Sequence, residues 1–204
     1  MQKIKKRQML QKNSKKKKKV IIITGVPGTG KTILANLISK KLGYTHIEIN
    51  KFAIEKNCIV GFDKKFNSKI VNLKKLQTEL NKLIKTTNKN LIIEGHLACE
   101  LNLNADVLII FRLDPFLLKK RLEKRGYIKE KIKENLEAEI LDYCTLQTEK
   151  IYPQKKIFEF DLSNKTQNQS LSLLLNFLKF KKFKKEKINW THYLLEENFS
   201  KAFL

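Results

Sequence analysis

Short apolar runs alternate along the chain with stretches in which apolar residues recur every three or four positions. Five runs are predicted to be strands, at 20–24, 46–49, 91–94, 107–111 and 157–160, and those at 20–24, 91–94 and 107–111 have the continuous apolarity of strands buried on both faces. The intervening spacing predicts helices over 32–42, 73–84, 115–126, 132–151 and 171–180. Strands that alternate with amphipathic helices are typical of an α/β fold with a five-stranded, mostly parallel sheet between two helical layers.

Charge separates the ends of the chain from this core. The 204 residues include 43 Lys and Arg against 20 Asp and Glu, a formal net charge of +23. Ten of the first nineteen residues are basic and none is acidic, so we expect residues 1–19 to form a disordered basic tail. Two explanations of the remaining excess stay open, namely a lysine-rich genome and a surface selected to bind polyanions.

Cysteine usage and hydropathy indicate the compartment. Cys58, Cys99 and Cys144 are odd in number and include no CxxC pair, which suits a reducing cytosol and argues against a disulfide framework or a zinc site. No run approaches the roughly 18 apolar residues of a membrane span, and no apolar segment follows the basic N-terminus. We expect a cytoplasmic protein without membrane contact, or a nuclear one if its cell has a nucleus.

A phosphate-binding motif follows the first strand. Residues 25–32 read GVPGTGKT, which matches G-x-x-x-x-G-K-[ST] between a buried strand and a helix. The glycines let backbone N–H groups turn toward an anion, and the helix N-terminus adds to their effect. Lys31 is predicted to reach the β- and γ-phosphates of ATP, and the Thr32 hydroxyl to bind Mg²⁺. The predicted ATP contacts are Gly28, Thr29, Gly30, Lys31, Thr32 and Ile33.

A carboxylate and a histidine follow the 91–94 strand. Open parallel sheets bind ligands at the carboxyl ends of their strands, where Glu94 falls. Glu94 is therefore predicted to hold Mg²⁺ or a water bound to it, or to position an attacking water. His96 could orient water, contact an acceptor phosphate or simply fill space, and the sequence leaves these roles open.

Two arginines mark a candidate lid. Arg121 and Arg125 are four residues apart on one predicted helix that ends at Gly126, so they share a face. Phosphoryl transfer needs cations that close over the transferring group, and we predict this role for both. Arg112, at the end of its strand, is a weaker candidate for the same task.

Together these motifs resemble a known family. The chain from residue 20 to about 165 is similar to the short Rossmann-type adenylate kinases of archaea and eukaryotes, the coilin-interacting nuclear ATPase type, whose members also assist maturation of the small ribosomal subunit. The segments that carry the resemblance are GVPGTGKT (25–32), GFD (61–63), IIEGHLA (92–98), ADVLIIFRLDP (105–115), RLEKRGY (121–127) and KIKENLEAEILD (131–142). The wording of IIEGHLA is closer to the archaeal branch.

The resemblance implies an organisation and an activity. It implies a nucleoside-monophosphate kinase domain over 20–180, with an acceptor segment at about 48–71 and a short lid at about 124–134. Arg125 would contact ATP, Lys165 would lie beside the adenine, and Glu94 and His96 would form the family's acidic-x-His pair. The acceptor segment departs from the family, because Ile54 stands where some relatives carry arginine, and Lys51 and Asn72 replace acidic residues.

Three functions remain in view. The first is an Mg²⁺-dependent adenylate kinase acting on ATP and AMP, with a side ATPase activity and a role in small-subunit maturation. The second is an ATP-switched assembly factor that binds ribosomal RNA or a ribosomal protein. The third is a kinase for another monophosphate, such as dAMP or CMP. The sequence leaves the oligomeric state open.

The C-terminal segment 181–204 mixes lysines with aromatic residues. Phe177, Phe180 and Phe183 lie among lysines, so they either stack on bases or pack on the core beneath snorkelling lysines, and we favour packing. The lysines stay available to an RNA backbone. Trp190 indicates that this segment docks back on the domain.

Overall fold

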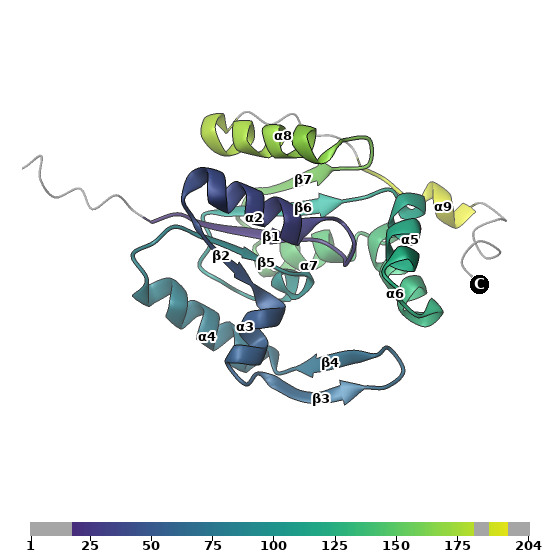
Figure 1. Ribbon diagram of the computed structural model, residues 1–204, viewed down its shortest axis with the longest axis horizontal. Coiled ribbons are helices and arrows are strands. Elements are labelled where there is room, and N and C mark those ends of the chain that lie inside the picture. The colour runs from purple at the N-terminus through teal and green to yellow at the C-terminus, as the bar shows by residue number, and fades with distance from the viewer. Residues whose placement is uncertain (1–17, 182–187, 196–204) are drawn as a thin grey trace, which may run out of the picture.

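A five-stranded sheet forms the centre of the computed structural model, which describes residues 18–181 and 188–195 (Figure 1). Its strands, in spatial order, are β2 (Thr45–Glu48), β5 (Leu91–Glu94), β1 (Val20–Thr24), β6 (Val107–Arg112) and β7 (Ile157–Asp161). All neighbouring strands are parallel, so their carboxyl ends lie on one edge. The predicted α/β fold is confirmed.

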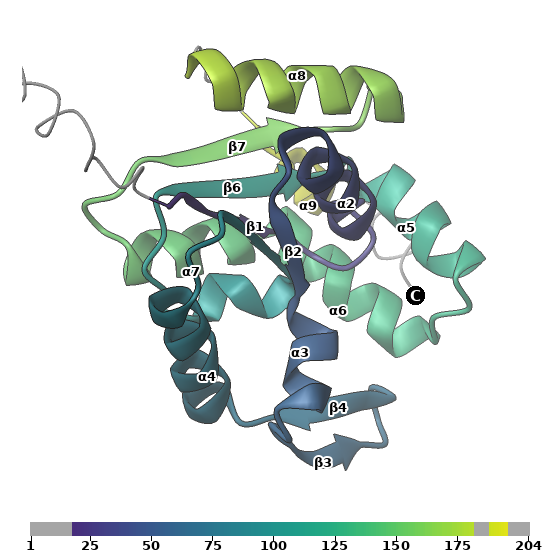
Figure 2. The same ribbon diagram turned by 60° about the vertical axis from the view of Figure 1, so that its left-hand side comes forward.

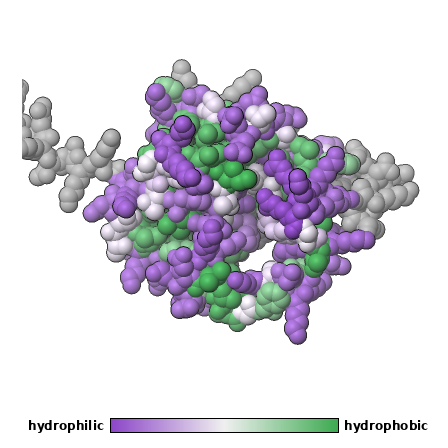
Figure 3. Space-filling model, viewed as in Figure 1, coloured by the Kyte–Doolittle hydropathy of each residue, from purple (hydrophilic) through white to green (hydrophobic). Residues whose placement is uncertain are grey.

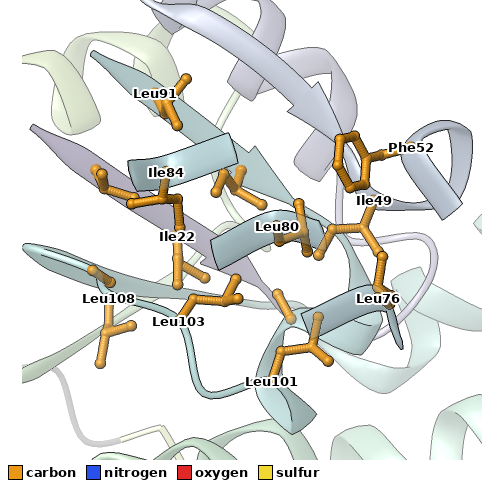
Figure 4. Close-up of a cluster of buried hydrophobic side chains, with 14 of the residues drawn as sticks. Ile22, Ile49, Phe52, Leu76, Leu80, Ile84, Leu91, Leu101, Leu103 and Leu108 are labelled. Atoms are coloured by element: carbon orange, nitrogen blue, oxygen red, sulfur yellow. The ribbon is translucent and has the colours of Figure 1, made fainter. Parts of the chain in front are cut away.

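Helices cover both faces of the sheet, as Figures 1 and 2 show. Helices α2 (Lys31–Leu42) and α8 (Gln167–Phe180) lie side by side on one face. On the other face lie α4 (Leu73–Thr86) and α7 (Tyr143–Ile151). The apolar stripe of α4, which contains Leu76, Leu80 and Ile84, packs on the strands (Figure 4). Burial of both faces of the sheet explains why the three central strands, β5, β1 and β6, are almost entirely apolar, whereas the edge strands β2 and β7 include polar residues.

Local capping explains where several helices begin. The Asn72 side chain accepts a hydrogen bond from the Lys75 amide at the start of α4. Asp114 does the same for α5 (Pro115–Lys124), where Pro115 takes the first helical position. Thr166 and Gln169 form a reciprocal capping box at the start of α8. These contacts satisfy amides that have no partner inside the helix.

The prediction of one helix over 132–151 is wrong, because two helices occupy that range. Helix α6 (Lys129–Ile140) ends and α7 begins around Asp142, whose φ of 54° is left-handed. The Asp142 carboxylate accepts a hydrogen bond from Arg112 on β6. This long-range contact holds the bend, which no glycine or proline marks in the sequence.

The chain between β2 and β5 contains more structure than its pattern predicts. Helix α3 (Ile49–Glu55) is followed by an antiparallel hairpin of β3 (Ile59–Asp63) and β4 (Ser68–Val71). The hairpin projects from the body of the domain on the side of α6 (Figure 1). It therefore places an arm next to the carboxyl edge of the sheet.

The described C-terminal residues dock on the domain, as Trp190 indicates. The indole Nε1 donates to Glu139 Oε1 over 3.2 Å, and Tyr193, on the short α9 (His192–Leu195), donates to Asp114 over 2.6 Å. Phe177 is buried as expected, whereas Phe180 is 56% exposed, so core packing is wrong for that residue. Phe183 and most of the predicted tail lie outside the described residues.

Within the described ranges, no helix combines the length and apolarity needed to cross a membrane.

Candidate active site

A cavity of about 620 Å³ lies at the carboxyl ends of the strands. The phosphate-binding loop of residues 25–32, the P-loop, borders it on one side, and α3 and the hairpin border it on the other. In Figure 3 the surface is hollowed above the hairpin. Eight predicted site residues line this cavity: Gly28, Gly30, Lys31, Thr32, Ile33, Glu94, His96 and Arg125.

The P-loop turn depends on glycine at two positions, Gly25 and Gly30. Gly25 has φ of 135°, and a Cβ there would lie 2.4 Å from the Phe111 carbonyl oxygen. Gly30 has φ of 95° and precedes the first residue of α2 without side-chain capping. Side chains disfavour both conformations. The N-terminus of α2 faces the cavity and carries no side-chain cap, so its backbone N–H groups can bind an anion there.

Lys31 is positioned before any phosphate binds. Its side chain is buried, and Nζ donates to the Val26 carbonyl over 2.8 Å. Burial lowers the pKa of this ammonium, and the Glu94 carboxylate opposes that shift. The Thr29 hydroxyl also donates to the Val26 carbonyl, over 3.1 Å, which leaves only the Thr29 main chain for a phosphate. A phosphate would give Lys31 the anionic partner that a carbonyl cannot supply.

Glu94 has the properties of a metal ligand. Only 1% of its surface is exposed, it lines the cavity, and its Oε1 is buried without a hydrogen-bond partner among the described residues. Thr32, on α2, offers a hydroxyl to the same cavity. The described residues contain no group of three or more His, Cys, Asp or Glu side chains suited to a metal. Mg²⁺ uses one or two protein oxygens together with phosphates and waters, so this donor set fits it.

His96 is a neutral imidazole facing the cavity. Its backbone follows Gly95, where a Cβ would lie 2.9 Å from the Ile49 Cβ. Burial lowers the pKa of His96 to about 4, and the charges of Lys31 and Lys131 act in the same direction. At neutral pH its ring can accept a hydrogen bond or a proton.

The two lid arginines occupy different positions. Arg125, the residue that ends α5, lines the cavity. Arg121 does not line it, and its Nη1 donates to the Gly28 carbonyl over 3.2 Å. Arg121 thus contacts the P-loop from α5, while Arg125 is available to a ligand.

The structure contradicts the suggestion that Arg112 clamps the transferring group. Arg112 is 2% exposed, and its guanidinium is bonded to Glu139 at 2.7 Å, to Glu159 at 2.9 Å and to Asp142. Its donors are therefore used in a buried cluster between β6, α6, α7 and β7. This role could not be read from its position at a strand end.

Lys165 does not reach the cavity either. It lies between β7 and α8, and its Nζ donates to the Asp161 carbonyl over 2.8 Å. Neither Lys165 nor its neighbours in this loop line the cavity. The placement of Lys165 beside an adenine stays a prediction.

Several lining residues escaped the sequence reasoning. The hairpin contributes residues 66–69 at its tip, and α6 contributes Lys131. The Lys131 ammonium lies 5.4 Å from the centre of the Phe66 ring, so the hairpin tip touches the lid. The signal for a hairpin was present, because apolar pairs at 59–60 and 70–71 flank the turn residues Asp63 and Asn67.

The fold and this site define a P-loop nucleotide kinase. The chain matches the family model described as an AAA domain over residues 21–142. Its relatives include a "Putative adenylate kinase" of Methanocaldococcus jannaschii, 32% identical over 83% of this chain and 91% of the relative. A protein of the same name from Methanococcus maripaludis is 36% identical over 85% of this chain and 98% of the relative. The chain belongs to the same nucleotide kinase family as these relatives.

Solved structures agree on the fold. The shikimate kinase of Bacteroides thetaiotaomicron superposes with a TM-score of 0.51 at 19% identity, covering 79% of this chain and 98% of that one. An uncharacterized protein from Eubacterium ventriosum gives 0.54 at 10% identity, covering 80% and 99%. At such identities the likeness extends to the architecture alone.

Proposed function

We propose that this protein is an adenylate kinase that transfers the γ-phosphoryl group of ATP to AMP, with Mg²⁺, to give two ADP. The observation that carries the proposal is the shared cavity, in which the P-loop faces the segment formed by α3 and the hairpin. A donor and an acceptor nucleotide could bind there with their phosphates between the two. Such proximity supplies much of the catalysis of phosphoryl transfer.

Each polar group has a role in this proposal. The P-loop amides and Lys31 hold the β- and γ-phosphates, and Arg125 neutralises charge on the transferring group. Thr32 and Glu94 would hold Mg²⁺, which would screen the phosphate charge. His96, neutral at neutral pH, is placed to accept a hydrogen bond from the acceptor phosphate or from a water. Arg121 links α5 to the P-loop through its hydrogen bond to the Gly28 carbonyl.

The acceptor side of the cavity combines apolar and polar groups. Helix α3 and the hairpin contribute apolar side chains that could pack on a base: Ala53, Ile54, Ile59, Phe66 and Val71. They also contribute polar side chains that could bind its sugar or phosphate: Asn50, Asn67, Ser68 and Lys69. Ile54, at the position where some members of the resembled family carry arginine, lines the cavity. Lys69 of β4 would supply a cation on this side instead. The AMP preference is thus a part of the proposal that needs its own test, with dAMP and CMP as competing acceptors.

Product analysis tests the proposal directly. Purified protein is incubated with Mg-ATP with and without AMP, and ADP, AMP and inorganic phosphate are quantified. We expect two ADP per AMP consumed, with slow phosphate release when AMP is omitted because the lid then excludes water imperfectly. Lys31→Ala should abolish both activities while the circular dichroism spectrum is unchanged. One slow rate of phosphate release, indifferent to AMP, would exclude the acceptor assignment.

The net charge of +23 favours a second candidate, an ATP-switched factor that binds ribosomal RNA or a ribosomal protein. Contacts between lysines and an RNA backbone release counterions, so binding should weaken steeply with salt. Removal of residues 1–19 should weaken RNA binding and leave ADP formation unchanged. RNA binding that ignores both nucleotide and salt would count against this candidate.

A further inference from the structure

His46 and Glu94 project from neighbouring strands onto the same face of the sheet. In the parallel register of β2 and β5, His46 pairs with Ile92 and Glu48 pairs with Glu94. Paired residues share a face, as do residues two apart on one strand. Ile92 packs in the core cluster beneath α2, so His46 and Glu94 lie on the α2 side as well.

The two side chains meet through atoms that lack other partners. His46 Nε2 lies 3.5 Å from Glu94 Oε1. Both atoms are buried, and neither has a hydrogen-bond partner among the described residues. An unpartnered carboxylate oxygen is costly to bury, which favours closing this gap. Hydrogen bonds in ligand-free active sites are often long and tighten when substrate binds.

Nearby lysines do not replace this contact. The Glu94 charge acts on two nearby lysines. Burial lowers the pKa of Lys31 and Glu94 opposes that shift, whereas Glu48 is the main cause of the raised pKa of Lys51 and Glu94 adds to it. However, Lys31 Nζ is bonded to the Val26 carbonyl, and Lys51 Nζ is bonded to Glu48 at 2.7 Å. His46 therefore offers the donor that faces Oε1.

His46 approaches Glu94 from outside the active cavity. It lines a second hollow, of about 430 Å³, together with Thr32 and Asn36 of α2 and with Glu48. It does not line the cavity proposed for the nucleotides. A substrate in that cavity would contact Glu94 and not His46.

We propose that His46 is a positioning residue for Glu94. Its Nε2–H donates to Oε1, which holds the carboxylate in one rotamer and leaves the second oxygen for Mg²⁺ or its bound water. Partners of this kind orient metal ligands, and their loss typically costs about 10- to 100-fold in metal affinity or activity. The inference rests on the proposed metal role of Glu94 in the kinase reaction.

Two substitutions separate positioning from packing. His46→Phe keeps a ring of similar size and removes the donor, whereas His46→Gln keeps a donor at a similar reach. Two quantities are measured for each: the Mg²⁺ concentration that gives half-maximal ADP formation, and the dissociation constant of ATP with and without Mg²⁺ by calorimetry. His192→Phe, an equivalent change on the surface helix α9, is the matched control.

We expect His46→Phe to raise the half-maximal Mg²⁺ concentration about 10- to 100-fold. The KM for AMP and the affinity for metal-free ATP should stay close to wild type. His46→Gln should recover most of the loss, and His192→Phe should match wild type. If His46→Phe does not fold, His46→Leu takes its place as the variant without a donor.

Two results would overturn the inference: normal Mg²⁺ dependence in the variant without a donor, or equal loss in His46→Gln, which would indicate packing alone. Failure of the proposed function looks different. In that case wild-type protein itself would form no ADP from AMP or would gain no ATP affinity from Mg²⁺.

Discussion

A single buried arginine organises the region behind the site. Burial alone would lower the pKa of Arg112, but Glu139 and Asp142 outweigh it and raise the pKa, so the guanidinium stays charged. Glu139 is 2% exposed, whereas the side chains of Asp142 and Glu159 are 36% and 24% exposed. Loss of Arg112 would therefore leave one carboxylate, that of Glu139, buried without its cation.

Arg112→Met should destabilise the protein by about 3–5 kcal/mol, because removing one partner of a buried ion pair leaves an uncompensated charge. Urea denaturation of the ligand-free protein measures the change. Arg125→Met, on the surface, should shift the free energy of unfolding by only about 0.5 kcal/mol. Adding Glu139→Gln to Arg112→Met should restore part of the loss. A single mutant as stable as wild type would show that Glu139 finds another partner.

At the scale of elements, the end of α8 shows a local conflict between residue and backbone. Lys181 ends the helix with φ of 53°, and its amide donates to the Phe177 carbonyl over 2.7 Å. Helices commonly end with a left-handed residue, and glycine is the residue that adopts it without cost. The chain has an exposed lysine at this position instead.

Lys181→Gly should stabilise the protein by about 1 kcal/mol, because glycine removes the steric cost of the left-handed conformation. Thermal unfolding provides the measurement. Burial lowers the pKa of Lys19 and the nearby charge of Lys181 lowers it further, so removal of that charge is a second possible source of stabilisation. Lys181→Ala removes the charge and keeps the strained Cβ, so it should recover little of the gain. Equal stabilisation by both variants would assign the effect to charge.

At the scale of the whole molecule, the cavity is bounded by parts that are far apart in sequence. The hairpin tip and the lid meet where Lys131 lies over the Phe66 ring at 5.4 Å. Both residues line the cavity, and one comes from the acceptor side and the other from α6. The contact therefore joins the two arms that a pair of nucleotides would have to pass.

Phe66→Ala should raise the KM for AMP about two- to fivefold, the loss expected of one exposed cation–π contact. Phosphate release without AMP should increase, because water reaches the phosphates more easily when the arms are not joined. Steady-state kinetics measures both. Phe62→Ala is the control, since Phe62 is on the same hairpin and 54% exposed but does not line the cavity. Identical kinetics for the two variants would mean that the contact does not act on the acceptor.

The elements could be predicted where their cause is local. The β1 run and the P-loop glycines require little beyond nearby sequence, and Glu94 follows directly from its position at a buried strand end. Helix 132–151 could not be divided in advance, since the bend at Asp142 depends on Arg112, thirty residues away. Arg112 was mistaken for a candidate clamp for the same reason, because the carboxylates that bind it are distant in the sequence.

The sequence by itself determined the order in which the functional groups follow one another along the chain: a phosphate loop, then a carboxylate with a histidine, then arginines on a helix. Periodicity and motif spacing are local properties, so they survive without coordinates. Only the tertiary structure decided which groups face one cavity. It brought Phe66 to Lys131, turned Arg112 away into a cluster of carboxylates, and placed His46 against Glu94, because side-chain partners across strands and helices depend on register and packing.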